Sequence, residues 1–396
     1  MKRILLLLAF VLSSTIAGAQ SYYQDAKNSE MLRHADRHEP CRRELVLPQV
    51  NGYDVYKADL HTHTVFSDGQ VMPLLRVYEA WLDGLDIMAV TEHIEYRPRE
   101  GEYVSYLKKY VDEKYDGAVN IRIGDKAATQ EGIMVDLNHC VKLSQKEAMK
   151  YGILIIPGSE ITRSGSAVGH FNALFTTDNN LIYDPDPLKS LRNAKAQGAL
   201  IQHNHPGWTR ENIDFTETEK IAYSEGLIDG VEVMNGAEFY PGIIERVQKY
   251  GQFISANSDI HSTTAVSYNL YGAIRPMTLV FAKENTLEAV REALEADRTL
   301  ALGFDTLCGE EQLLKDFFTA GVKVRVIRKT DKAIELAVTN ITSIPYTIRK
   351  GQANQQKLDA FSTIKLSVSK QAKTLDLTVL NMFSGKDIHP TVKLTF

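Results

Sequence analysis

The sequence has 396 residues, of which 44% are hydrophobic and 24% are charged, and its net charge is −5. This length favours one large domain plus a smaller one, and the average composition excludes a disordered chain or a coiled coil. With no basic block in the sequence, the charge argues against an extended nucleic-acid surface, although a metal site could still attract a single phosphate group.

The first 19 residues have the pattern of a secretory signal peptide. Lys2 and Arg3 precede an apolar stretch over residues 4–12, and small residues end at Ala19. We predict cleavage after Ala19 and a soluble periplasmic or secreted protein, whose net charge is −7 because two positive charges leave with the signal. An uncleaved membrane anchor is the alternative, but the apolar stretch is too short to span a bilayer. Residues 20–52 form an N-terminal extension.

The cysteine count is odd for an exported protein. Cys41, Cys140 and Cys308 allow at most one disulfide bond, and their spacing matches no zinc finger or CxxC motif. Small buried residues without a role in chemistry are the simpler interpretation, and the disulfide status stays open.

Residues 53–305 alternate between short β-rich runs and amphipathic helical stretches, a pattern typical of a parallel α/β arrangement. We predict strands at residues 55–60, 86–91, 153–159, 171–176, 199–203, 230–234, 253–256 and 277–282. We predict helices at residues 71–85, 188–197, 217–225, 243–250 and 286–296. In a barrel of this kind the reactive groups lie at the carboxyl ends of the strands, where the loops converge.

A long connection, residues 95–143, interrupts this alternation and contains Tyr103, Tyr106, Tyr110 and Tyr115. A connection of this length is usually functional or disordered. A lid or pocket wall and an aromatic surface insertion are both open interpretations.

After residue 321 the pattern changes to alternating apolar and polar residues without intervening helices, as in Val322, Val324 and Val326. This alternation is typical of antiparallel β-structure. We predict a small β-sandwich over residues 321–396, joined to the first domain by a linker over residues 306–320 whose helix is expected at residues 310–318.

Histidine and carboxylate residues gather at the ends of the predicted strands. The stretch Asp59-Leu60-His61-Thr62-His63 is followed by Asp68, and further clusters close later runs. These clusters are Thr91-Glu92-His93, Gly158-Ser159-Glu160, Gly169-His170, His203-Asn204-His205-Pro206 and Ser258-Asp259-Ile260-His261. One His-x-His pair is often structural, but imidazole and carboxylate ligands together suit zinc, manganese or iron, and the absence of Cys argues against a structural zinc site.

In this order the motifs resemble those of the PHP (polymerase and histidinol phosphatase) family of metal-dependent phosphoesterases, over residues 53–305. The resemblance implies a distorted seven-stranded β/α barrel that binds two or three divalent metal ions. The segments 66–69, 92–98, 160–163 and 204–206, together with the C-terminal β domain, most resemble the exported Sb-PDE-type phosphodiesterases.

The resemblance also implies how the ligands are distributed. One metal takes His61, His63, Glu160 and Asp259. Glu160 bridges to a second metal, which takes His170 and His205, and a third metal takes Asp68, His93 and His261. Asp259, Glu160 and His205 are the expected catalytic residues. Glu92 stands where the family usually has Asp, and we expect it to orient His93 through a hydrogen bond.

The sequence defines the substrate contacts less closely. Arg163 could pair with a phosphate oxygen through its guanidinium group, or it could form a structural salt bridge. His203 shares a strand face with His205 by spacing, and we interpret it as a residue that lines the pocket or supports a ligand. Asn204, Trp208 and Asn235 are further candidates for the pocket.

The hypothesis from these residues is hydrolysis of a phosphate ester by a metal-bound hydroxide that attacks phosphorus in line, without a nucleophilic side chain. The resemblance and the signal peptide favour small organic phosphate diesters as substrates. A phosphomonoesterase of the histidinol- or nucleotide-phosphatase kind is the first alternative. The second is a non-catalytic exported binding protein on the same scaffold. The oligomeric state, the identity of the metals and the role of the C-terminal domain stay open.

Overall fold

The computed structural model describes residues 22–25, 27–34, 41–97, 119–121, 133–162 and 168–396. The predicted signal peptide, Arg163, and Tyr103, Tyr106, Tyr110 and Tyr115 of the long connection lie outside these residues. The chain divides into two compact units between residues 41 and 42. In the first unit, β1 (Tyr22–Asp25) pairs antiparallel with β2 (Asn28–His34). Within the described residues, none of the helices has the length and apolar character needed to cross a membrane.

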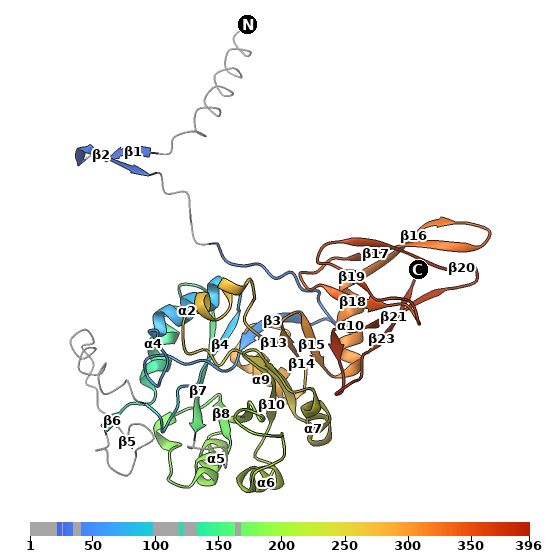
Figure 1. Cartoon of the computed structure of the whole chain (residues 1–396). Helices are drawn as coiled ribbons and strands as arrows, with labels where there is room; N and C mark the ends of the chain where they lie inside the picture. The colour runs from blue at the N-terminus through green and yellow to red at the C-terminus, as the bar shows by residue number, and fades with distance from the viewer. Residues whose placement is uncertain (1–21, 26, 35–40, 98–118, 122–132, 163–167) are drawn as a thin grey trace. The chain divides into compact units, whose positions relative to one another are not determined.

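A curled mixed sheet of twelve strands forms the centre of the second unit (Figure 1). Its strands follow the order β11-β10-β9-β8-β7-β4-β3-β13-β14-β15-β22, and β12 also pairs with β10. Their bounds are β3 (Asp54–Asp59), β4 (Ile87–Val90), β7 (Leu154–Thr162), β8 (His170–Leu174), β9 (Leu200–Asn204), β10 (Gly230–Asn235), β11 (Glu238–Phe239), β12 (Phe253–Asn257), β13 (Met277–Ala282), β14 (Thr299–Gly303), β15 (Thr306–Gly309) and β22 (Met382–Phe383).

The predicted parallel arrangement holds only for part of this sheet. Strands β3, β4 and β7 are parallel to one another, as are β9, β10 and β12, but β8 runs antiparallel to both β7 and β9. In this register His170, the first residue of β8, lies opposite Thr162 and Asn204, the last residues of its neighbours. A residue that opens a strand therefore reaches the sheet edge where the parallel strands end.

Helices cover the sheet, and local sequence explains where several of them begin. They are α2 (Pro73–Leu82), α4 (His139–Ala148), α5 (Pro187–Ala196), α6 (Glu217–Ser224), α7 (Ile244–Tyr250), α8 (Thr264–Ser267) and α9 (Leu287–Glu295). Proline occupies the first position of α2 and α5, where no amide hydrogen is needed. Thr216 and Glu219 form a reciprocal capping box at the start of α6. Within the long connection, β5 (Val119–Ile121) and β6 (Ile133–Val135) pair with each other.

The helix predicted at residues 310–318 is confirmed, but the rest of the predicted linker over residues 306–320 is not helical. Residues 306–309 form β15, which pairs antiparallel with β14, and only then does α10 (Glu311–Gly321) begin. Leu307 and Cys308 are fully buried at this edge of the sheet, so burial of apolar side chains favours the strand here. The Glu310 side chain accepts hydrogen bonds from the first amides of α10 and sets its start.

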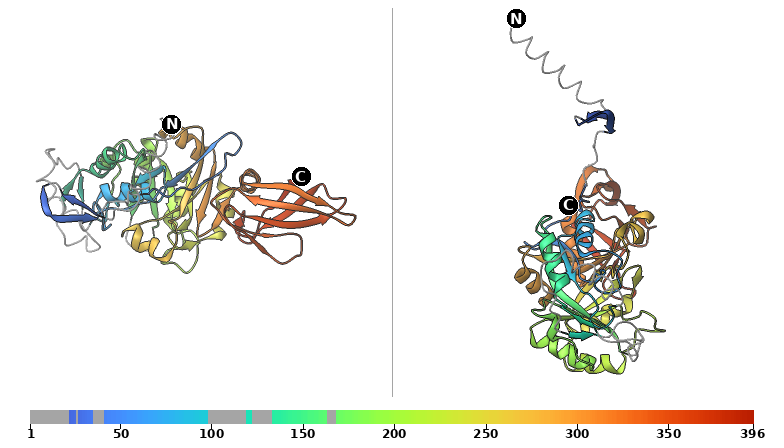
Figure 2. Two further views of the ribbon diagram at one scale, coloured as in Figure 1. Left: turned by 90° about the horizontal axis from the view of Figure 1, so that it is seen from above. Right: turned by 90° about the vertical axis from the view of Figure 1, so that its left-hand side faces the viewer.

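The predicted antiparallel β domain follows α10 and consists of two sheets, drawn orange to red in Figures 1 and 2. One contains β16 (Val322–Lys329), β17 (Ala333–Asn340) and β20 (Thr363–Ser369), and the other contains β19 (Gln356–Leu358), β18 (Tyr346–Arg349), β21 (Thr374–Val379) and β23 (Thr391–Thr395). Strand β22 instead pairs with β15 of the main sheet. One hydrophobic core runs from the main sheet through α10 into the β domain, where the rings of Phe318 and Tyr346 lie 4.8 Å apart. The β domain is therefore packed against the larger domain.

No disulfide bond joins the three cysteines, all of which the structure describes. Cys41 is exposed, whereas Cys140 and Cys308 are buried. Burial raises the pKa of both buried thiols well above the usual value, so they remain protonated and act as small packed residues.

Candidate metal centre

Two extended segments that follow β3 and β12 bring four of the expected ligands together. Thr62 and Ile260 form an isolated parallel bridge, and the Asp259 amide donates to the His61 carbonyl over 3.0 Å. Because side chains alternate along extended backbone, the residues on either side of this bridge project to the same face. His61, His63, Asp259 and His261 therefore converge although almost 200 residues separate the two segments.

The atoms of this group lie close enough to share one ion. His61 Nε2 and His63 Nε2 lie 3.2 Å and 3.0 Å from Asp259 Oδ1 and 3.1 Å from each other. Both imidazoles are completely buried. Two ring nitrogens and one carboxylate oxygen thus point at a common centre, which is the geometry that a divalent cation requires.

Glu160, near the end of β7, lies at the middle of a second group. Its Oε1 is 3.5 Å from His61 Nε2 and 3.7 Å from His205 Nε2. His170 Nδ1 also approaches Oε1, at 3.4 Å, while His93 Nδ1 lies 2.6 Å from Oε2. Glu160 is fully buried, and its position between these rings agrees with the bridging role that the family resemblance implies.

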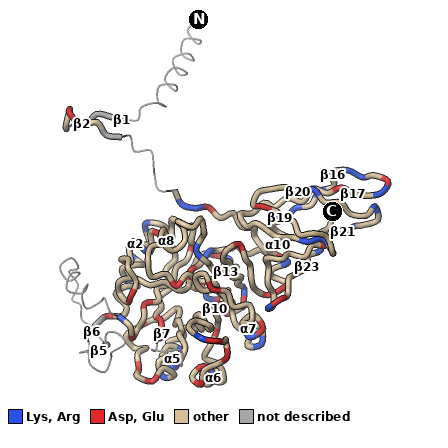
Figure 3. Tube along the Cα trace, viewed as in Figure 1, with Lys and Arg blue, Asp and Glu red and all other residues tan. Residues whose placement is uncertain are grey.

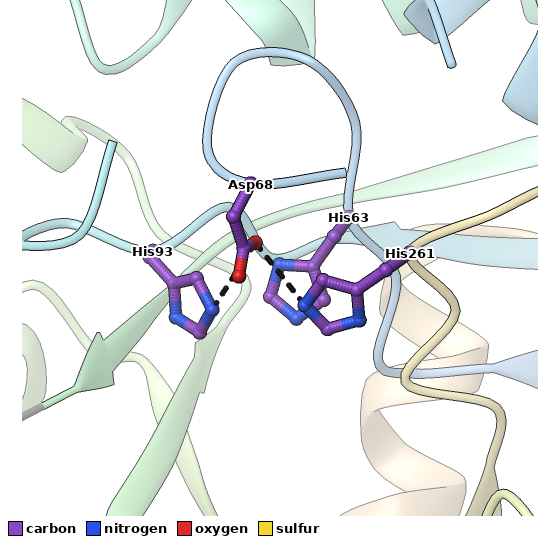
Figure 4. Close-up of side chains that lie close together, drawn as sticks. All are labelled: His63, Asp68, His93 and His261. Atoms are coloured by element: carbon purple, nitrogen blue, oxygen red, sulfur yellow. Dashed lines mark ion pairs between the residues drawn. The ribbon is translucent and has the colours of Figure 1, made fainter. Parts of the chain in front are cut away.

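Figure 4 shows the third group, in which Asp68 lies between two imidazoles. Asp68 Oδ1 is 3.1 Å from His261 Nε2 and 3.4 Å from His93 Nε2. The His63 ring stacks against the rings of His93 and His261, with 4.4 Å between centroids in each case. His63 therefore belongs to this group as well as to the group around Asp259.

The observed grouping differs from the predicted one in two respects. Potential ligand atoms cluster as His61, Glu160 and His205, as His61, His63 and Asp259, and as His63, Asp68, His93 and His261. His61 and His63 each belong to two clusters, whereas His170 joins none of them. His170 still lies beside the site, because its ring is 4.9 Å from the His205 ring. The predicted division came from the family resemblance, whereas here His61 and His63 each lie within reach of two groups of ligand atoms.

The electrostatics of the site fit a cation. Burial by itself raises the pKa of the Glu160 carboxyl, but the imidazoles of His93 and His61 outweigh this effect and hold the pKa well below its usual range. The same balance keeps the pKa of Asp259 low. Burial lowers the pKa of His93, yet its carboxylate neighbours, Glu160 first, raise it to about 10. The carboxylates are therefore ionised at neutral pH, and a bound cation would displace the proton that His93 holds.

Two of the ligands have strained backbone. His205 has φ 24° and Asp259 has φ 50°, in the left-handed region that side chains other than glycine rarely adopt. Each residue lies just beyond the end of a strand, β9 or β12, where the turn redirects its side chain. Such strain often marks functional sites, because the surrounding structure must hold it.

The turn at His205 also corrects the interpretation of His203. Strand alternation would place both side chains on one face, but the alternation ends at the left-handed His205. His203 instead points away from the ligands, with Nδ1 3.0 Å from the Tyr223 hydroxyl and Nε2 3.0 Å from Glu219 Oε1. It is fully buried and does not line the site.

The other predicted substrate contacts occupy different positions. Asn204 is buried, and its amide donates to Glu160 Oε1 over 2.9 Å, so it holds a ligand and does not meet substrate. Asn235 donates to Glu232 Oε2 over 2.9 Å and lies 3.4 Å from Asp259 Oδ2. Trp208 is 49% exposed at the rim of the site. Its ring lies 5.5 Å from the ring of His170 and 5.4 Å from that of His205.

Glu92 does not orient His93 as predicted. Its Oε2 accepts hydrogen bonds from the Thr64 amide (3.1 Å) and the Ser67 hydroxyl (2.5 Å). The Glu92 side chain therefore fixes the turn that leads from His63 to Asp68. Instead, the Thr162 hydroxyl lies 2.6 Å from His93 Nδ1.

Glu232 is an acidic residue of the site that the sequence motifs missed. It lies within β10, is fully buried, and places Oε1 2.9 Å from His61 Nδ1. Its Oε2 accepts the His205 amide over 2.8 Å. A carboxylate that bonds the outer nitrogen of a ligand imidazole fixes the ring and its tautomer. The signal was present in the sequence, because a glutamate interrupts the apolar run Gly230-Val231-Glu232-Val233-Met234.

Arg76 of α2 joins the two segments that carry the ligands. Its Nε donates to the His63 carbonyl over 3.0 Å, and its Nη2 donates to the carbonyls of Ile260 (3.2 Å) and Ser262 (2.9 Å). Glu79 lies 2.7 Å from Nη1 and compensates the buried charge. Burial lowers the pKa of Arg76 to about 10, which still leaves it charged at neutral pH. On an amphipathic helix such an arginine resembles an ordinary surface residue, so the sequence gave no sign of this contact.

The fold and the site define an α/β protein with a buried cluster of imidazoles and carboxylates that suits divalent metal ions. No protein-family profile and no curated protein matches the chain. Among solved structures, it is similar to a two-domain protein from Bacteroides vulgatus described as containing a predicted PHP-like metal-dependent phosphoesterase, with 32% sequence identity and a TM-score of 0.77. That match covers 91% of this chain and all of the other. The chain therefore belongs to the family of PHP-like metal-dependent phosphoesterases, which confirms the resemblance of the motifs.

A more distant similarity concerns a lesion-specific endonuclease from Pyrococcus furiosus. The two chains are 17% identical, the TM-score is 0.37, and the match covers 65% of this chain and 59% of that one. A similarity at this level carries no conclusion about function.

Proposed function

We propose that the protein is an exported phosphodiesterase that hydrolyses small organic phosphate diesters with two or three bound zinc, manganese or iron ions. The observation that carries this proposal is the overlap of three ligand clusters through the shared residues His61 and His63. When bound, metal ions in such a site supply activated water and neutralise charge on the phosphoryl group. The signal-like leader supports export, and the motif resemblance supports the diester.

The exposure of the ligands indicates the side from which an ester approaches. The side chains of His61, His63 and Glu160 are 0% exposed, so they form the floor of the site. Asp259 and His261 are 20% and 35% exposed and therefore face the open side. Substrate phosphate would meet the site there.

Residues at the rim would position the organic part of the ester. The indole of Trp208 stands beside the imidazoles of His170 and His205, where it offers an apolar surface to one substituent of the phosphate. Asn235, which reaches Glu232 and Asp259, fixes the carboxylate that faces the substrate. These contacts hold and orient the ester but do not themselves attack it.

A comparison of substrates tests the proposal. The mature protein, loaded separately with manganese, zinc or iron, would be assayed on bis(4-nitrophenyl) phosphate and on 4-nitrophenyl phosphate, with kcat/KM as the readout. We expect the diester to be the better substrate. A strong preference for the monoester would contradict the proposal and favour the phosphomonoesterase alternative.

Two further measurements test the metal dependence and the export of the protein. Elemental analysis of the purified protein should find metal, and chelation should abolish hydrolysis; a protein without either property would be a binding protein on this scaffold. N-terminal sequencing of protein recovered from cell fractions should show a mature chain beginning at Gln20 outside the cytoplasm. An intact Met1 terminus in the cytoplasm would contradict export.

A further inference from the structure

The net charge of the whole chain conceals a strong division along the sequence. Residues 321–396 contain thirteen Lys and Arg but five Asp and Glu, a net charge of +8. Residues 1–320 contain 32 Lys and Arg and 45 Asp and Glu, a net charge of −13. A division of this size favours contact between the basic part and an anionic partner. The basic residues form no contiguous block in the sequence, because the alternation along the strands separates them.

The basic residues gather on one face of the three-stranded sheet. In the register of β16, β17 and β20, Arg325 lies opposite Ala337, which lies opposite Lys365. Lys323, two residues before Arg325, projects to the same side. All three cations are exposed, whereas the opposite face carries buried residues such as Leu336. The sheet is thus apolar on one side and basic on the other.

The two turns at the end of this sheet extend the basic surface. The pairing of Ala333 with Ser369 places the turn after β16 next to the turn after β20. These turns contribute three exposed lysines, which are Lys332, Lys370 and Lys373. Figure 3 shows the positive residues along this end of β16, β17 and β20. We call the six residues Lys323, Arg325, Lys332, Lys365, Lys370 and Lys373 the cationic face.

Few acidic groups oppose this charge. Glu335 of β17 is already bound by Arg328 at 2.5 Å, which leaves Asp331 in the turn. Across all residues that the structure describes, Lys323, Arg325 and Lys365 find no ion-pair partner. Glu335 still interacts electrostatically with Lys365, but the cations of the face outnumber the acidic groups beside them and present an excess of positive charge to an external partner.

The chemistry of the surface favours a lipid bilayer over a nucleic acid. Between the cations lie small hydroxyl residues, Thr339, Thr363 and Ser367, and no aromatic ring on which bases could stack. Ile327 lies at the bulge of β16, where the register shifts, and is 40% exposed between Arg325 and Arg328. An exposed aliphatic residue among cations suits the headgroup region of a membrane.

We propose that the cationic face binds the surface of a bilayer rich in anionic phospholipid. Lysine and arginine side chains are attracted to such a surface within about one Debye length, roughly 10 Å at moderate salt. The negative remainder of the chain is repelled by the same surface, so the charge division also sets which part of the protein faces the lipid. This role is independent of the proposed hydrolysis, and a soluble ester would be hydrolysed equally well without it.

Vesicle binding of the mature full-length chain tests the proposal. Vesicles with about one-third phosphatidylglycerol in phosphatidylcholine would be compared with pure phosphatidylcholine by flotation, at salt from about 50 to about 300 mM. We expect binding to the anionic vesicles alone, and loss of that binding as the salt rises. The triple variant K323Q/R325Q/K365Q should bind about tenfold more weakly or worse.

A matched variant separates the cationic face from net charge. K357Q/K386Q/K393Q removes three exposed lysines from the same domain but outside the face, and it should bind within about twofold of the unmodified chain. Equal loss in both variants would show that the total charge decides binding and would overturn the proposal. So would tighter binding to duplex DNA or to a sulfated polysaccharide than to the vesicles. Unchanged thermal unfolding of both variants would exclude misfolding as the cause.

Discussion

The metal centre and the cationic face handle charge in opposite ways. At the centre, the nine expected ligands, six imidazoles and three carboxylates, lie close together and are largely buried, and each charged group has an oppositely charged or hydrogen-bonding neighbour. On the cationic face, the lysine and arginine side chains are exposed and form no ion pair within the described part of the chain. Removing one member of a buried network leaves its neighbours uncompensated, whereas removing an exposed charge alters only a screened field. Substitutions in the two regions should therefore differ in kind as well as in size.

The largest effect should come from Asp259, the carboxylate on which His61 and His63 converge. We expect Asp259→Ala to lower kcat/KM by about 10³-fold or more, because the substitution removes a ligand that the buried imidazoles share. The measurement is diester hydrolysis, with metal content determined on the same sample. Activity close to that of the unmodified chain would remove Asp259 from the site.

Arg76 should matter mainly for stability and for the geometry of the ligand segments. Arg76→Met removes the buried cation and leaves Glu79 uncompensated, which we expect to lower the free energy of unfolding by about 3–5 kcal/mol. Arg76→Lys keeps the charge but loses the forked contacts, and should restore stability more than metal affinity. Urea unfolding and metal titration of both variants provide the check. Full metal affinity in Arg76→Lys would show that the carbonyl contacts are unimportant.

Glu219 allows a test by pH, away from the ligands. Burial raises the pKa of its carboxyl, but His203 and Arg210 outweigh this and lower it from 4.5 to about 2. A lowered folded-state pKa stabilises the protein above pH about 4.5, by up to ~3 kcal/mol, and this contribution is lost as the pH falls towards 2. The stability difference between the unmodified chain and Glu219→Gln should thus shrink from pH 6 to pH 3, as measured by urea unfolding. A stability difference that does not change with pH would contradict a lowered pKa of Glu219 in the folded protein.

Glu232 should give a smaller effect, confined to metal binding. Glu232→Gln keeps the shape of the side chain but weakens its hold on His61 Nδ1, and we expect about 10–100-fold lower metal affinity or activity. Substituting the exposed Lys365 by Gln should change the free energy of unfolding by less than about 0.5 kcal/mol. Isothermal titration with zinc and thermal unfolding would compare the two variants. Equal effects of the Glu232 and Lys365 substitutions would contradict the expected difference between buried and exposed charges.

Much of the candidate site could be predicted because its residues follow local patterns. His61, His63, Glu160, Asp259 and His261 each lie at the end of a short apolar run, and such runs are visible within a few residues of sequence. The antiparallel β domain could also be predicted, because its apolar and polar residues alternate with a period of two. The roles of Arg76 and Glu232 could not be predicted, because each depends on contacts with residues far away in the sequence.

The sequence by itself determined which segments form helices and strands, that the ligands are imidazoles and carboxylates, and which family the motifs resemble. These features depend on residue type and on short spacings. Only the tertiary structure decided how the ligands divide among clusters, since the Thr62–Ile260 bridge joins segments almost 200 residues apart. It also decided that β8 runs antiparallel to its neighbours, which places His170 at the site. The left-handed backbone at His205 directs its side chain away from that of His203. Side-chain direction at the end of a strand depends on where the chain goes next, and that depends on packing against the whole fold.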